Sequence, residues 1–261
     1  MLELDALHRT GNRLDPKLRG LVRWAAADAD GCDYGKAVAA SDLRRAGISE
    51  KELQALTSDL SRLPPPERAA VAFARKMMRE AHAVTDDEVK ELLHFFGEER
   101  LVALVALAAH ASFQDRIFLA TNVQIEPGEP FPPLTVAFAR PKPPDHGTTP
   151  TAKKEAVLFS SRNSAPGAEW LELQDSLSKQ RQRPGRIRVP SRQEVLKRIG
   201  ENHPAAWQAS ILWSRVCYGF QPELTDAWFA CAMAFRQEAG LDKVFEQSIF
   251  WVVTQSLQCF Y

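Results

Sequence analysis

The sequence predicts an all-α protein, and three observations lead to this fold class. Apolar residues recur at helical spacing in many segments, such as 67–80. Helix start signals are present as well: Ser49 with Glu52, and Thr85 with Glu88, each form the S/T-x-x-E pattern of a capping box. No segment keeps an alternation with a period of two, so no strand is predicted.

Residues 3 to about 122 are expected to form successive helices. Three prolines, 64–66, precede the helix at 67–80, because proline is tolerated in the first helical turn. Gly47 and Gly97 stand where a helix end needs a left-handed residue. The nearly apolar run 101–112 is far shorter than the roughly 20 residues of a membrane span, so we expect a buried helix and no membrane partner.

The composition changes between about Gln124 and Ala168. Eight prolines lie between residues 127 and 150, and polar residues then replace aliphatic ones. We interpret residues 126–168 as a proline-rich linker. It would join a first helical domain at 1–125 to a second at 169–261, where helical patterning resumes.

The charge and the cysteine content exclude several classes of protein. Lys plus Arg and Asp plus Glu both total 33, so no net field would hold nucleic acid. The first ten residues have neither a basic nor an apolar signal region, so a cytoplasmic location is expected. Four cysteines are too few and too scattered for a disulfide framework.

An internal repeat relates the last 21 residues to a segment 227 positions earlier. Five positions are identical, and three of them are rare residue types in this chain. The matched pairs are Leu14 and Leu241, Asp15 and Asp242, Trp24 and Trp251, Cys32 and Cys259, and Tyr34 and Tyr261. We therefore expect two copies of one helical unit.

The segment 18–47 carries the first copy's most specific motif. An apolar helix leads to Cys32, Tyr34 and Gly35, and a second helix then ends at Gly47. This arrangement resembles the carboxymuconolactone decarboxylase / alkylhydroperoxidase D family, in which such a helix leads to C-x-Y-C and a histidine four residues later. The resemblance covers about residues 3–125, and more weakly 205–261. It implies an alkylhydroperoxidase D-like helical bundle in tandem, with the second copy incomplete.

The chemistry of such a motif follows from its geometry. A cysteine at a helix N-terminus faces the positive end of the helix dipole, which favours the thiolate. A second cysteine three residues later lies one turn away and can form a disulfide with a sulfenic acid. A nearby histidine and glutamate can move the proton. The resemblance thus implies a thiol-dependent, peroxiredoxin-like peroxidase that uses a thiol reductant or dithiol electron donor and no cofactor.

The first copy departs from this motif at three positions. Gly35 replaces the attacking cysteine, Ala39 replaces the histidine, and Gly20 replaces the upstream glutamate that the family commonly carries. Cys32 and Tyr34 match the motif, but Cys32 has no resolving partner nearby. We therefore expect Cys32 to be a buried structural residue.

The second copy keeps the opening of the motif. Cys259 and Tyr261 fit C-x-Y, and Glu246 and Gln247 lie near the position of the upstream acid. We expect a cysteine and a histidine to follow Tyr261 in a longer natural chain. The candidate catalytic residues are therefore Cys259, Glu246 and Tyr261, with Cys32 and Tyr34 as their counterparts in the first copy.

Two alternatives to a peroxidase stay open. One is a non-catalytic helical assembly or binding protein that has lost the motif. The other is the lactone decarboxylation for which the family is named, although no set of residues points to it. The six histidines show no metal-ligand spacing, so no metal site is predicted. The apolar C-terminal segment leads us to expect a homo-oligomer.

Overall fold

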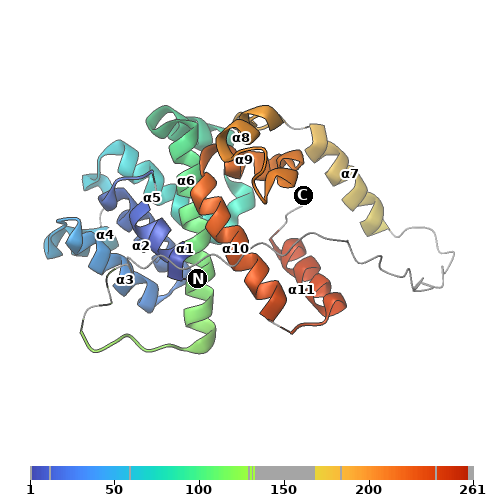
Figure 1. The fold of residues 1–261 in the computed structure, drawn as a ribbon. Helices are drawn as coiled ribbons and strands as arrows, with labels where there is room; N and C mark the ends of the chain where they lie inside the picture. The colour runs from blue at the N-terminus through green and yellow to red at the C-terminus, as the bar shows by residue number, and fades with distance from the viewer. Residues whose placement is uncertain are drawn as a thin grey trace. The chain divides into compact units, whose positions relative to one another are not determined.

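The computed structural model describes residues 2–11, 13–58, 60–128, 130, 132, 168–182, 184–238 and 240–257. Within these ranges every regular element is a helix, which confirms the predicted all-α class (Figure 1). The chain divides into two compact units: Met1–Phe138 with Arg186–Asp242, and Ala139–Gly185 with Lys243–Tyr261. These units interleave along the chain, whereas the domains expected from the sequence follow one another. Most of the predicted linker lies outside the described residues.

The larger unit contains most of the helices. Its first part comprises α1 (Leu2–Ala6), the π-helical turn η1 (Leu7–Gly11), α2 (Pro16–Asp30), α3 (Asp33–Arg45), α4 (Glu50–Ser58), α5 (Pro65–Glu80) and α6 (Asp86–Thr121). Its second part comprises α8 (Arg192–Ile199), the 3₁₀ turn η4 (Ala206–Ser210), α9 (Leu212–Phe220) and α10 (Pro222–Glu238). The smaller unit contains α7 (Ala168–Gln182) and α11 (Lys243–Ser256).

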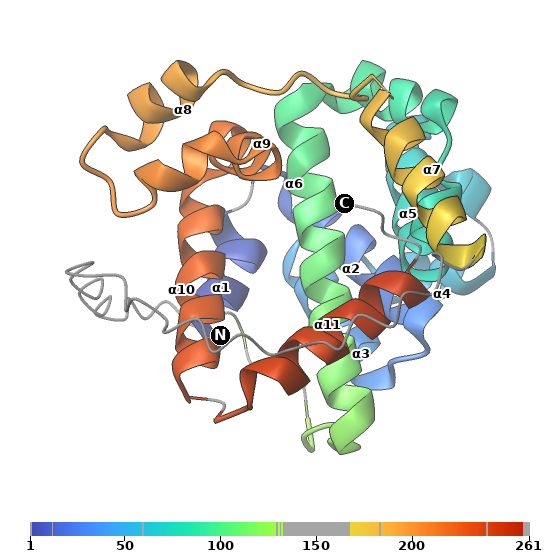
Figure 2. The same cartoon turned by 90° about the vertical axis from the view of Figure 1, so that its right-hand side faces the viewer.

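The main core of the larger unit lies where α2, α5 and α6 meet. Helix α6 runs along both α2 and α5, as Figure 2 shows. Alanines at the contact, including Ala25, Ala70 and Ala103, are fully buried. Small side chains let helix backbones approach closely, and the leucines around them fill the remaining space. The frame that holds the Cys32 motif is therefore a tightly packed three-helix contact.

The predicted helix signals are confirmed. Thr85 and Glu88 form the capping box that starts α6, and Ser49 bonds Glu52 in the same way ahead of α4. Gly97 has a left-handed φ of 67°, and it kinks α6 where the sequence predicts a helix end.

Helices α8 to α10 pack on the first part of the larger unit. Helix α9 contacts α6, and α10 contacts α1. The Gln221 amide donates to the Glu99 carbonyl at 2.9 Å, and the Arg188 backbone N–H donates to the Glu98 carboxylate at 2.6 Å. A small second core gathers around the fully buried Tyr218. These contacts explain why residues after Arg186 join the first half in one unit.

The helix boundaries repeat with the offset seen in the sequence. The turn η1 ends at Gly11 and α2 begins at Pro16, while α10 ends at Glu238 and α11 begins at Lys243. Both pairs of boundaries differ by 227 residues (238 − 11 and 243 − 16). Many apolar side chains of α11 are exposed, Trp251 among them. No helix in the described ranges is long and apolar enough to cross a membrane.

Candidate functional site

Cys32 lies at the turn between α2 and α3. Gly31 ends α2 in the left-handed conformation with a φ of 71°, and this reverses the chain direction. Cys32 is then the N-cap of α3, and its sulfur accepts a hydrogen bond from the Gly35 N–H at 3.3 Å. Only 1% of Cys32 is exposed. The expectation that Cys32 is buried is confirmed.

Asp115 of α6 occupies the space next to Gly35. A Cβ built on Gly35 would overlap the Asp115 carboxylate and would lie 2.9 Å from the Ala27 Cβ. Asp115 is itself 2% exposed, so it has little room to move aside. The side chain of a cysteine at position 35 would thus need the volume that this carboxylate fills.

The Cys32 thiol and the Asp115 carboxyl perturb each other. Burial raises the pKa of Cys32 to about 11, although the Gly35 N–H opposes the shift, and the Asp115 charge raises this pKa further. Burial also raises the pKa of Asp115 to about 6, against the hydrogen bond from Cys32. At neutral pH the thiol therefore keeps its proton. Burial and the facing carboxylate outweigh the helix dipole that would favour a thiolate.

Tyr34 is half-buried and faces a different partner. Its hydroxyl donates to the Glu126 carboxylate at 2.6 Å, and its ring centroid lies 4.3 Å from that of Phe118. Burial, followed by Glu126, raises the pKa of Tyr34 to about 12. Tyr34 therefore ties the start of α3 to the segment after α6.

The other motif positions are closed or lie elsewhere. Ala39 is fully buried in the main core, and a Cβ on Gly20 would lie 2.6 Å from the Leu43 Cγ. Glu246 is half-buried on α11 in the smaller unit. Cys259 and Tyr261 fall outside the described residues. Of the predicted site residues, the structure brings only Cys32 and Tyr34 into one region.

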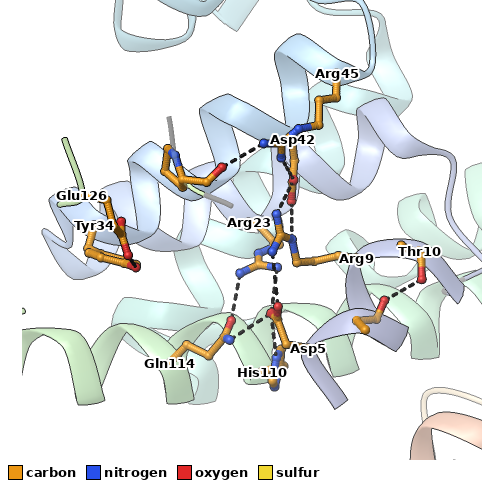
Figure 3. Close-up of polar contacts among 12 residues, drawn as sticks. Asp5, Arg9, Thr10, Arg23, Tyr34, Asp42, Arg45, His110, Gln114 and Glu126 are labelled. Atoms are coloured by element: carbon orange, nitrogen blue, oxygen red, sulfur yellow. Dashed lines mark hydrogen bonds and ion pairs between the residues drawn. The ribbon is translucent and has the colours of Figure 1, made fainter. Parts of the chain in front are cut away.

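A buried polar network, which the sequence analysis did not predict, lies beside α2 (Figure 3). The Asp5 carboxylate accepts from the Gln114 amide at 2.9 Å and from Arg23 at 3.3 Å. The ring of His110 stacks on that of His8 with centroids 4.3 Å apart. The position of His110 inside the apolar run 101–112 is the one sequence signal for a buried polar group.

The network fixes the protonation of its members. Burial would raise the pKa of Asp5, but His110, Arg23 and Arg9 outweigh it and hold the pKa well below the ordinary range. Burial lowers the pKa of both His8 and His110, and Arg23 adds to this. Both imidazoles are therefore neutral at neutral pH, and they have no free charge to offer a substrate.

Among the described residues, no group of three or more His, Cys, Asp or Glu side chains is arranged to hold a metal ion. The chain matches no protein-family model and no curated protein. The family resemblance therefore depends on the motif around Cys32 and on its repeat at the C-terminal end.

Proposed function

We propose that the larger unit is a non-catalytic helical module of the carboxymuconolactone decarboxylase / alkylhydroperoxidase D type, in which Cys32 is structural. One observation carries this proposal: the Asp115 carboxylate fills the space that a second cysteine at position 35 would need. The altered position and its neighbour fit each other, as expected of a site that has been repacked.

The state of Cys32 supports the same conclusion. A thiol reduces a peroxide only as the thiolate, and it must also meet the peroxide. With a pKa of about 11, roughly one molecule in 10⁴ carries the thiolate at pH 7. The sulfur is also shielded by α2, α3 and α6. Both requirements are therefore unmet at Cys32.

Thiol titration tests this proposal. In a variant in which Cys217, Cys231 and Cys259 are changed to Ser, Cys32 is the only thiol. We expect it to react with an aromatic disulfide reagent only after denaturation. The variant with Asp115→Ala added serves as the control, and it should react faster in the folded state. Rapid reaction of folded protein that retains Asp115 would contradict the proposal.

A second candidate function is a thiol-dependent peroxidase centred on Cys259. The repeated helix boundaries favour it, because Cys259 would follow α11 as Cys32 follows α2. In this reaction the thiolate attacks one peroxide oxygen, which leaves a sulfenic acid and releases an alcohol. A second thiol then forms a disulfide and releases water, and a dithiol donor reduces the disulfide.

Matched cysteine variants test this second candidate. Hydroperoxide consumption with dithiothreitol as donor is measured for the full chain, for Cys259→Ser and for Cys32→Ser. We expect the Cys259 change to abolish the activity and the Cys32 change to leave it intact. Activity that survives the Cys259 change would exclude that role for Cys259.

A further inference from the structure

A small pocket lined by arginines lies between η1, the start of α2 and the end of α3. Its volume is about 160 Å³. Arg9, Arg19, Arg23 and Arg45 line it, together with Asp42 and Gly20. None of these side chains belongs to the pair formed by Cys32 and Asp115, so the pocket is a separate feature of the larger unit.

Two of the arginines share one carboxylate. Arg9 donates from Nε and Nη2 to the two Asp42 oxygens at 2.8 and 2.6 Å. Arg45 donates from Nη1 to the same carboxylate at 3.0 Å, and Figure 3 shows both side chains converging on Asp42. A single negative charge is thus held by two guanidinium groups, which also fix its orientation.

Positive charge exceeds negative charge at this pocket. Arg23 shares Asp5 with Arg9, so among the described residues two bridging carboxylates serve three of the four arginines. The fourth, Arg19, is half-buried, and its Nη1 donates to the Leu14 carbonyl at 2.8 Å.

The surroundings of Arg19 are unfavourable to its charge. Burial lowers the pKa of Arg19, and this effect outweighs the attraction of Asp15 and Asp42. A partly desolvated guanidinium is stabilised by an anion placed next to it. The pocket is therefore arranged to gain from a negatively charged group.

We propose that this pocket binds a small oxyanion, supplied by the phosphate or carboxylate group of a low-mass molecule. The planar guanidinium fork matches both groups with paired hydrogen bonds. The volume suits one such group with few additional atoms. Because Cys32 is not involved, this inference goes beyond the proposed function and does not depend on it.

Calorimetric titration of the full chain tests the proposal, with inorganic phosphate and malonate as separate ligands at low ionic strength. We expect saturable binding that weakens as sodium chloride is added. The variant Arg19→Gln should bind at least about tenfold more weakly, because a charge-assisted hydrogen bond is lost. Arg13→Gln is the matched control, since Arg13 is exposed and outside the pocket. It should bind almost as the unchanged protein does.

The two ligands separate the two sources of the oxyanion. Tighter binding of phosphate indicates a phosphorylated ligand, and tighter binding of malonate indicates a carboxylate. If circular dichroism shows that Arg19→Gln is unfolded, Arg45→Gln takes its place with the same expected loss. Absence of saturable binding for both ligands, or equal weakening by the pocket and control variants, would overturn the proposal. The thiol titration of Cys32 is unaffected by any of these outcomes.

Discussion

Replacing Gly35 by alanine should show how tightly Asp115 fills the space beside α3. Alanine in a helix is normally more stable than glycine by about 0.5–1 kcal/mol. At this position the added Cβ would overlap the Asp115 carboxylate, and overpacking of a buried site costs about 1–3 kcal/mol. We therefore expect Gly35→Ala to lower the free energy of unfolding by about 1 kcal/mol, against its helix propensity.

The same substitution in an Asp115→Ala background is the matched comparison. Without the carboxylate, Gly35→Ala should recover most of its normal gain, less the effect of the Ala27 Cβ at 2.9 Å. The coupling between the two positions should thus be about 1–3 kcal/mol. Urea unfolding of the four proteins measures it. An equal effect of Gly35→Ala in both backgrounds would refute the overlap.

Three further predictions concern the larger unit. The folded pKa of Asp115, about 6, lies above the usual value of about 4, so its contribution to stability is present below pH 4 and is lost as the pH rises through 6. The difference in unfolding free energy between the protein and Asp115→Asn should change over this range. Arg9→Met should cost about 3–5 kcal/mol because it leaves Asp42 partly unpaired, and Arg9→Met combined with Asp42→Leu should cost less than the sum of the single changes in urea unfolding. Thr85→Ala should lower the free energy of unfolding by about 0.5–2 kcal/mol through loss of the capping box of α6.

The local helix signals of the sequence predicted much of the fold. Capping boxes and left-handed glycines act through backbone atoms a few residues away, so Ser49, Thr85 and Gly97 could be interpreted without any tertiary contact. The joining of residues 186–242 to the first half was not predicted. It depends on long-range contacts such as that of Gln221 with Glu99, which leave no spacing pattern in the sequence.

The candidate site was predicted only in part. The sequence identified Gly35 as the altered position and predicted that Cys32 is buried. It did not indicate Asp115, which lies 80 residues further along the chain (115 − 35) on α6. The network around Asp5 was missed for a related reason: its members come from α1, η1, α2 and α6, and each one alone resembles an ordinary surface charge. Only packing reveals that they share one buried region.

The ionisation of Cys32 tests the central claim most directly. The measurement is the rate of alkylation by iodoacetamide at Cys32 as a function of pH, followed by mass spectrometry of the folded protein. With a pKa of about 11, the rate should stay low from pH 7 to 9 with no inflection in that range. An inflection below about pH 8 would mean that the thiolate forms readily. That result would contradict a structural role for Cys32 and return it to the candidate catalytic residues.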